Sequence, residues 1–242
     1  MILVYWFPKK YNAANPKGAY APKWTYSGKL DLIIWSVPAA IIVVLGHISW
    51  HQTHHVDPWK PIASTAKPIT IEVVSLDWKW LFIYPEQKIA AVNQLVFPVK
   101  VPLNFKVTSD TVVSSFFIPQ LGSQIYCIAG RQSRLHLLAR EPGEYFGQNQ
   151  QFSGDGYSYM HFKSIATSQE KFEAWVQKVK QSTEKLDHAR FEELRKPTYG
   201  FPVTTYSAVE PGLFDHILNG PHTAPPGITH PSPAPTAPPE GN

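Results

Sequence analysis

Cysteine is almost absent from this chain of 242 residues, whose only thiol is that of Cys127. A single cysteine excludes an intrachain disulfide, a Cys-x-x-Cys redox pair and any zinc or iron–sulfur site that needs two thiolates. Charged residues are also scarce, at 17%, and the 22 Lys and Arg form no run of five. A nucleic-acid partner is therefore not expected, although the net charge is +4.

Formal charge is missing altogether from the apolar run over residues 32–50. A helix of that length spans roughly 28 Å, close to the hydrocarbon thickness of a bilayer. A cleavable signal has a shorter apolar region nearer the chain start, so the run predicts a transmembrane helix over 30–51. Trp35 and Trp50 suit the two membrane interfaces, and Pro38 indicates helical neighbours that satisfy the freed carbonyl.

Lysines are distributed unevenly around this predicted helix. The lysines before it are Lys9, Lys10, Lys17, Lys23 and Lys29, whereas only Lys60 and Lys67 follow it closely. By the positive-inside rule the N-terminal side is cytoplasmic. We therefore expect a protein of the bacterial inner membrane whose C-terminal domain is periplasmic.

The chain start is apolar over residues 1–7 but too short to cross a bilayer. We interpret residues 1–29 as the stump of a first membrane helix followed by a cytoplasmic loop. A hydrophobic segment that lies on the membrane is the alternative. On the first interpretation, the natural reading frame is expected to continue upstream through a complete helix and a secretory signal.

After a linker over residues 52–68, the region 69–166 contains short runs rich in β-branched and aromatic residues, separated by Pro, Gly and Asn. Several runs alternate apolar with polar residues, which is typical of half-buried strands. The predicted strands are 69–74, 80–84, 94–97, 103–108, 114–118, 133–139 and 161–166. Short strands at this spacing predict an antiparallel sandwich or barrel.

Residues 167–220 are predicted to be a helical, aromatic-rich extension. Thr167 and Glu170 have the spacing of a capping box, and Phe172, Trp175, Val176 and Val179 fall on one helix face. A second helix is predicted over 186–195, before Lys196-Pro197. The proline-rich residues 221–242 cannot bury a core and are predicted to be a disordered tail.

Four segments in this order resemble subunit II of the haem–copper respiratory oxidases, and specifically their quinol-oxidising, bo-type branch. They are Trp24 to Pro38, Pro68 to Trp80 with its Asp-Trp-Lys-Trp, Ser115 to Tyr126, and Phe152 to Met160. The resemblance implies a two-helix hairpin that anchors a periplasmic cupredoxin-like β-sandwich against the catalytic subunit. The chain departs from that branch at its front, where the first helix and the signal with its lipid-bearing cysteine are missing.

The cytochrome c-oxidising branch of that family carries a dinuclear copper centre in the sandwich, with two thiolates, two imidazoles, a thioether and a carbonyl as ligands. Placed on the family's ligand motifs, this sequence retains Met160 and has vacated the other ligand positions, which are Ser114, Asn149, Gln151, Ser153 and Tyr157. One retained side chain cannot hold copper. We therefore expect no metal or cofactor in this chain, and haems and copper in the partner catalytic subunit.

Cys127 could alternatively belong to a mononuclear blue-copper site with His136, His161 and Met160. Such sites place a histidine shortly after the cysteine, and none follows Cys127 at that spacing. A buried free cysteine that behaves as a small hydrophobe is the favoured interpretation.

Three histidines, His51, His54 and His55, follow the membrane run at helical spacing. They could bind a metal ion, but Asp57 is the only nearby carboxylate and no cysteine is close in sequence. An interfacial polar cluster where the helix leaves the bilayer is favoured.

The resemblance also suggests roles for three further residues. Asp31 matches the position of a glutamate near the entry of a proton-uptake channel, so it is a proton-uptake candidate, with a helix cap as the simpler alternative. Trp78 and Trp80 occupy an aromatic motif that lies near the cytochrome c docking face in copper-bearing relatives. Without copper behind them, we interpret both as core-packing and subunit-contact candidates.

Together these observations predict a non-catalytic subunit of a proton-pumping, respiratory-chain oxidase that transfers electrons from ubiquinol to oxygen. Its expected partners are the catalytic subunit I, further small membrane subunits and membrane lipid, with ubiquinol handled by the complex. Two alternatives remain open: an electron-entry subunit II of a cytochrome c oxidase, and a free-standing membrane-anchored cupredoxin-like protein.

Overall fold

The computed structural model describes residues 2–12, 14–15, 25–55, 57 and 59–220. The chain divides into two units, Met1–Val56 and Asp57–Asn242. The predicted disordered tail over 221–242, like Lys17 and Lys23, lies outside the described residues.

The first unit contains the helices α1 (Ile2–Lys10) and α2 (Gly28–His55). In α1 the Lys10 ammonium lies 4.3 Å from the centre of the Trp6 ring. Among the described residues, α2 is the one helix long and apolar enough to span a membrane, and it extends beyond the predicted 30–51 at both ends. No residue of α2 is buried within the chain, so its apolar surface is open to lipid or to another protein.

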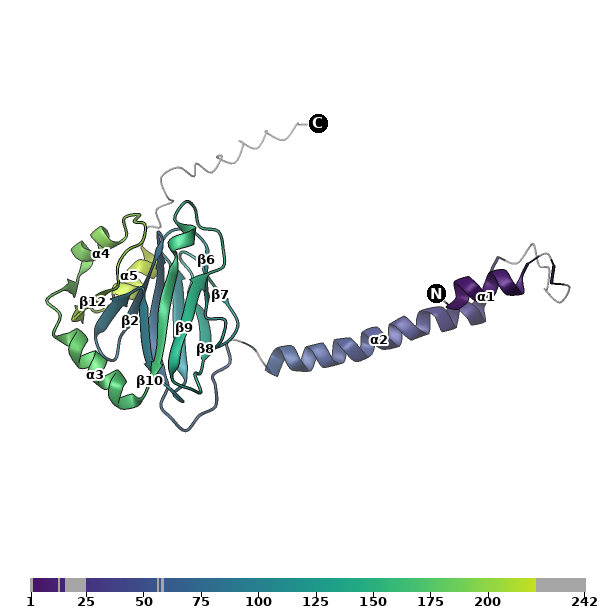
Figure 1. The fold of residues 1–242 in the computed structure, drawn as a ribbon, viewed down its shortest axis with the longest axis horizontal. Helices are drawn as coiled ribbons and strands as arrows, with labels where there is room; N and C mark the ends of the chain where they lie inside the picture. The colour runs from purple at the N-terminus through teal and green to yellow at the C-terminus, as the bar shows by residue number, and fades with distance from the viewer. Residues whose placement is uncertain (1, 13, 16–24, 56, 58, 221–242) are drawn as a thin grey trace, which may run out of the picture. The chain divides into compact units, whose positions relative to one another are not determined.

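The second unit is a sandwich of two β-sheets (Figure 1). One sheet has the strand order β12-β3-β2-β1-β5-β8 and the other has the order β4-β10-β9-β6-β7. In chain order the strands of these two sheets are β1 (Ile69–Leu76), β2 (Lys79–Tyr84), β3 (Ile89–Val92), β4 (Gln94–Pro98), β5 (Leu103–Ser109), β6 (Ser114–Phe117), β7 (Ile125–Cys127), β8 (Ser133–Leu137), β9 (Gly143–Asn149), β10 (His161–Thr167) and β12 (Thr204–Tyr206).

The predicted sandwich is confirmed, but its sheets are mixed, so the prediction of antiparallel pairing is wrong for two pairs of strands. Strand β1 pairs in parallel with β5, and β10 pairs in parallel with β4. The chain leaves β1, forms β2 to β4, and returns to the free edge of β1 in the same direction. Two strands that pair in parallel must be joined by such a crossover. A prediction that joins each strand to the next one by a hairpin gives antiparallel pairs only.

All seven predicted strands are present, whereas β3, β7, β9 and β12 were not predicted. The sequence of β9 begins and nearly ends with glycine, at Gly143 and Gly147, which weakens a strand signal. Gly147 is nevertheless required there, because a Cβ at this position would lie 2.2 Å from the Phe162 ring.

Aromatic rings fill the main core between the two sheets. The Phe116 and Phe162 rings stack with centroids 5.3 Å apart, and the Trp80 ring meets each of them edge-on. Such pairs contribute about 0.5–1.5 kcal/mol each beyond the area that they bury. Helix α3 (Gln169–Lys180) adds Phe172, Val176 and Val179 to this core, as predicted.

The start of α3 differs by one residue from the predicted capping box. Ser168 is the N-cap, and its Oγ accepts a hydrogen bond from the Lys171 backbone N–H at 3.4 Å. Thr167 cannot cap the helix because it is the last residue of β10 and pairs with Pro98. Because β10 extends through Thr167, the N-cap of α3 lies one residue later than predicted, at Ser168.

The rest of the extension packs against the outer face of the six-stranded sheet, except for β12, which forms the edge strand of that sheet beside β3. Its elements are β11 (Lys185–Leu186), α4 (His188–Leu194), β12, β13 (Ala208–Val209) and α5 (Leu213–Asn219). The second predicted helix is α4, which begins later than predicted because Leu186 pairs in β11 and Asp187 caps the helix, its Oδ1 accepting from the Arg190 N–H at 2.8 Å.

A second hydrophobic core forms where the extension meets that sheet. Leu186, Phe191, Leu194, Tyr206, Leu213, Phe214 and Ile217 of the extension pack against Val74, Leu76, Leu81, Ile83, Ala90 and Val92. Strands β2 and β3 are consequently buried along their whole length. The extension is an integral part of the folded unit.

Candidate functional site

The vacated metal-ligand positions lie around the loop that joins β9 to β10. Asn149 ends β9, Ser153 lies in the loop, and Met160 follows the short 3-10 helix η1 (Tyr157–Tyr159). These three side chains are 4%, 8% and 2% exposed, so the site is closed to water. The structure thus brings three of the six positions into contact.

Asn149 forms the centre of this cluster. Its Oδ1 accepts hydrogen bonds from the backbone N–H groups of Ser115 (2.8 Å) and Gln151 (2.9 Å). Its Nδ2 donates to the Gln151 carbonyl (2.7 Å), the Ser153 Oγ (3.1 Å) and the Met160 Sδ (3.2 Å). One side chain therefore fixes the strand before the loop, the loop itself and the thioether beyond it.

The other three positions do not converge on this centre in the same way. Ser114 is buried, and its Oγ donates to the Ser75 Oγ at 2.5 Å. The Gln151 side chain is exposed, and its bonds to Asn149 use backbone atoms. Tyr157 is half-buried and packs against the Phe152 ring, with centroids 5.9 Å apart.

The donor set at this cluster does not fit copper. The retained Met160 Sδ faces the N–H of an amide, and the remaining groups are hydroxyls and backbone carbonyls, which are hard or neutral ligands. Dinuclear copper in proteins requires thiolates and imidazoles. Within the described part of the chain, no group of three His, Cys, Asp or Glu side chains is arranged to hold a metal ion.

In the part of the chain that the structure describes, Cys127, His136 and His161 do not form a group that could hold a metal ion. Cys127 is buried on β7, whereas His136 lies on β8 in the other sheet. His161 is exposed and stacks on Phe146, with ring centroids 5.7 Å apart. The fully buried, free Cys127 confirms the interpretation as a small hydrophobe.

Burial raises the pKa of the Cys127 thiol to about 12, although hydrogen bonds with the Ser114 side chain and the Phe116 backbone oppose the shift. Between pH 9 and pH 12 the unfolded thiol ionises while the folded thiol stays protonated, so stability falls as the pH rises. In a fragment over 67–220, we expect the free energy of unfolding of Cys127→Ala, relative to the parent, to rise by about 1.4 kcal/mol between pH 8 and pH 10. Urea unfolding at both pH values measures this, and an unchanged difference would contradict the shift.

Trp78 closes the cluster from outside. Its indole N–H donates to the Ser153 carbonyl at 2.8 Å, and its backbone adopts a φ of 111°, which an L-residue rarely does. The ring lies so close to Gly156 that a Cβ there would be 2.1 Å from it. Glycine at position 156 therefore permits the contact between the tryptophan and the loop.

Residues of the extension cover the other side of Trp78. The Tyr199 ring stacks on it with centroids 4.9 Å apart and planes inclined by 8°. The Thr198 N–H donates to the Asp77 carbonyl (3.3 Å), and Lys79 Nζ donates to the Lys196 carbonyl (2.7 Å). We refer to these contacts of residues 195–201 with residues 77–79 as the extension clasp.

Two more polar contacts strengthen the extension clasp. Arg195 makes a bidentate ion pair with the buried Asp110, at 2.9 and 3.1 Å. The Asn93 Nδ2 donates to the Phe201 carbonyl at 2.7 Å. Burial lowers the pKa of Lys79 to about 8, while Asp77 opposes the shift.

The extension clasp corrects the interpretation of the tryptophan pair. Trp80 is fully buried between the sheets, so it is a core residue and cannot contact another subunit. Trp78 is only partly buried, and Tyr159 and Tyr199 beside it are 50% and 56% exposed. Subunit contact therefore stays a prediction for Trp78 alone.

The predicted residues of the first unit all lie on α2. Asp31 is in the first turn, where its backbone N–H donates to the Ser27 carbonyl at 2.9 Å. His54 Nδ1 lies 2.8 Å from the Trp50 carbonyl, and its ring packs on the Trp50 ring. These contacts agree with an interfacial polar cluster, and the proton-uptake role of Asp31 stays a prediction.

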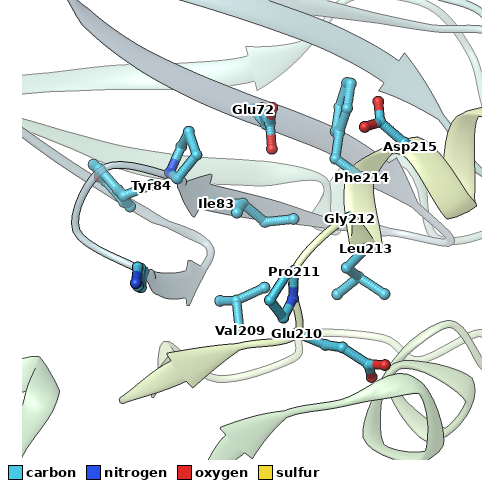
Figure 2. A pocket seen from close by; sticks show the side chains of 12 residues that line it. Glu72, Ile83, Tyr84, Val209, Glu210, Pro211, Gly212, Leu213, Phe214 and Asp215 are labelled. Atoms are coloured by element: carbon cyan, nitrogen blue, oxygen red, sulfur yellow. The ribbon is translucent and has the colours of Figure 1, made fainter.

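A cavity of about 310 Å³ lies where the extension meets β1 and β2 (Figure 2). Its apolar wall includes Ile83, Leu213 and Phe214, and the Glu72 and Asp215 carboxylates lie on either side of Phe214 at its rim. Burial raises the pKa of Glu72, Asp215 adds to the shift, and Lys106 at 3.3 Å opposes it. No pattern in the sequence indicates this cavity, because residues 72–88 and 209–215, which are far apart in the chain, form it.

Comparison with known proteins identifies the two parts of the second unit. Residues 81–166 match the family described as the periplasmic domain of cytochrome c oxidase subunit II, and residues 180–220 match the COX aromatic-rich motif. The periplasmic domain of subunit II of a cytochrome oxidase from Bradyrhizobium japonicum aligns with a TM-score of 0.46 and 21% identity, over 49% of this chain and 96% of that one. The fold class is a helix long and apolar enough to span a membrane followed by a cupredoxin-like β-sandwich, and the sandwich carries the match to the subunit II periplasmic domain.

Two relatives define the branch. The chain is 50% identical to cytochrome bo(3) ubiquinol oxidase subunit 2 of Pseudomonas putida over 90% of its own length and 70% of the relative's. It is also 50% identical to ubiquinol oxidase subunit 2 of Acetobacter aceti, over 88% of this chain and 69% of that protein. The chain belongs to the ubiquinol oxidase subunit 2 family, which confirms the resemblance seen in the sequence.

Proposed function

We propose that this chain is the membrane-anchored, non-catalytic subunit II of a quinol oxidase complex in the bacterial inner membrane. The complex would transfer electrons from ubiquinol to oxygen and move protons outward, with its haems and copper in the catalytic subunit I. Family membership supports the oxidase assignment, and α2 supplies the membrane anchor. Further small membrane subunits and lipid are the other proposed partners.

The observation that carries the non-catalytic role is the hydrogen-bonded cluster at Asn149. In a copper-bearing sandwich, the metal would tie the β9–β10 loop to the neighbouring strand. Here an amide performs that task through five hydrogen bonds to Ser115, Gln151, Ser153 and Met160. We infer that the sandwich was kept as a rigid outer domain after its electron-transfer ligands were replaced.

A second observation argues against an electron-entry role at Trp78. The extension clasp stacks Tyr199 on one face of that ring, and Gly154 and Gly156 lie against the indole as well. The ring is thus a packing element that joins sandwich, loop and extension. Its exposed neighbours Tyr159 and Tyr199 are where we place a contact with subunit I.

Purification through a tag on this chain tests the proposal. In gently solubilised membranes we expect the tagged chain to carry haem-containing protein and to oxidise ubiquinol with oxygen uptake. Recovery of the chain without haem protein would favour the alternative of a free-standing cupredoxin-like protein. Oxidation of reduced cytochrome c by the preparation would favour the alternative of an electron-entry subunit.

We also propose that Asp31 lies near the entry of a proton path of the complex, as its place at the start of α2 suggests. Asp31→Asn preserves the shape of the side chain but removes its charge and its proton. We expect steady-state ubiquinol oxidation to slow several-fold while the haem content of the purified complex is unchanged. Normal turnover in the assembled complex would reduce Asp31 to a helix cap.

A further inference from the structure

The cavity between the extension and the six-stranded sheet (Figure 2) has an apolar wall that packing holds in place. Ile83 and Tyr84 end β2, and Leu213 and Phe214 begin α5. Each of these four side chains is at most 3% exposed. The cavity volume of about 310 Å³ falls at the small end of the range for small-molecule sites, which is about 300–1,000 Å³. The wall is therefore pre-formed for a small apolar group.

Carboxylates outnumber ammonium groups around this cavity. Glu72, Glu210 and Asp215 line it, whereas Lys88 is the one lysine in the lining that the structure describes. Figure 2 shows the Glu72 and Asp215 carboxylates on either side of Phe214. These two carboxylates sense each other's charge, because burial raises the pKa of Glu72 and Asp215 adds to the shift. The rim of the cavity therefore carries an excess of negative charge.

The three carboxylates differ in the partners that they already have. Glu72 pairs with Lys106 at 3.3 Å. The Glu210 Oε1 lies 3.3 Å from the His188 Nε2, and its Oε2 accepts a hydrogen bond from the His188 backbone N–H at 3.0 Å. Asp215 is exposed, and its carboxylate makes no ion pair with any residue that the structure describes. Asp215 is thus the carboxylate that a bound cation can pair with.

This combination of groups selects one class of ligand. An ammonium group is attracted by the face of an aromatic ring and forms charge-assisted hydrogen bonds with carboxylates. The apolar wall suits a hydrocarbon group, which gains free energy by leaving water. A metal ion does not suit the cavity, because in the described part of the chain no three His, Cys, Asp or Glu side chains are arranged to hold one. An anion would meet the carboxylates at the rim.

We propose that this cavity binds a small organic ammonium compound, whose hydrocarbon part lies against Ile83 and Leu213 while its ammonium group pairs with Asp215 beside Phe214. The site lies within the folded unit that contains the sandwich and the extension, and all of its residues come from this chain. The proposal goes beyond the role of the chain in an oxidase and does not depend on it.

The probe is para-fluorobenzylamine, which is protonated at neutral pH and combines an ammonium group with a small apolar ring. The purified full chain in a non-ionic detergent is titrated with it, and the fluorine relaxation rate of the probe reports binding. Detergent without protein gives the reference. The alcohol of the same shape, para-fluorobenzyl alcohol, is the control without charge. We expect saturable binding of the amine at millimolar concentration, and binding of the alcohol that is weaker by at least about fivefold.

Two variants locate the bound probe. Asp215→Asn removes the charge at the rim and should weaken binding of the amine about fivefold, the upper range for an exposed ion pair. Asp155→Asn is the matched control, because Asp155 is also exposed but lies in the loop between β9 and β10. Its binding of the amine should equal that of the parent chain. Equal binding of amine and alcohol by the parent chain would overturn the proposal, and so would equal effects of the two substitutions.

Discussion

Truncation after Lys180 is expected to abolish folding of the outer domain. It removes seven buried side chains of the second core and exposes the sheet face beneath them, including Leu76, Leu81 and Ile83. Each buried aliphatic or aromatic side chain contributes about 1.5–3 kcal/mol, so the loss is about 10–20 kcal/mol. That loss is comparable with or larger than the whole stability of a typical domain, which is about 5–15 kcal/mol.

Two fragments measure this effect. A fragment over 67–220 is expected to be monomeric and to unfold cooperatively in urea, whereas one over 67–180 is expected to aggregate or to show no unfolding transition. The longer fragment is the matched control, because it differs from the shorter one only by residues 181–220. A cooperative transition of similar midpoint in the shorter fragment would show that the extension is a separate appendage.

The second large effect is expected from Asn149→Leu, which keeps the number and branching of the side-chain heavy atoms and removes all of the hydrogen bonds of the side chain. Two backbone N–H groups, of Ser115 and Gln151, and the Gln151 carbonyl would then lose buried partners. Each unsatisfied group costs about 1–3 kcal/mol, so the fragment should lose at least about 3 kcal/mol.

Gln151→Ala provides the control, since position 151 is also a vacated ligand position but its side chain is exposed. Substitutions of that kind usually change stability by less than about 0.5 kcal/mol. Urea unfolding of the three fragments gives the comparison. Similar stabilities for Asn149→Leu and Gln151→Ala would mean that the amide cluster does not replace the metal as a structural tie.

The strands of the sandwich could be predicted because alternation or an apolar run marks each of them. In β5, Leu103, Phe105 and Val107 face the core, as their spacing indicates. The parallel pairing of β1 with β5 could not be predicted, since it depends on which strands the chain crosses over. Local patterns do not contain that information.

The burial of β2 on both faces has a signal in the sequence. Trp80-Leu-Phe-Ile-Tyr is continuously apolar, which is typical of a strand covered on both faces. A strand that is covered on both faces places Trp80 in the interior and requires a second layer over the sheet. Lys79, which precedes Trp80 in β2, is also buried. Its ammonium group therefore needs a buried hydrogen-bond acceptor, which the Lys196 carbonyl provides.

The Asn149 cluster was visible in the sequence only as a set of lost ligands. Spacing placed Asn149, Ser153 and Met160 at the right positions, but nothing in it revealed that the amide would bond to the backbone at Ser115. Such bonds depend on the register between β6 and β9. The chemistry that replaced the metal is therefore a finding of the structure.

Copper binding by the outer domain tests the central claim most directly. The fragment over 67–220 is incubated with copper, passed through a desalting column, and examined by metal analysis and near-infrared absorption. The amide, hydroxyl and thioether groups around Asn149 predict no stoichiometric copper and no near-infrared band. Two coppers per chain with such a band would contradict the account of a sandwich held together without metal.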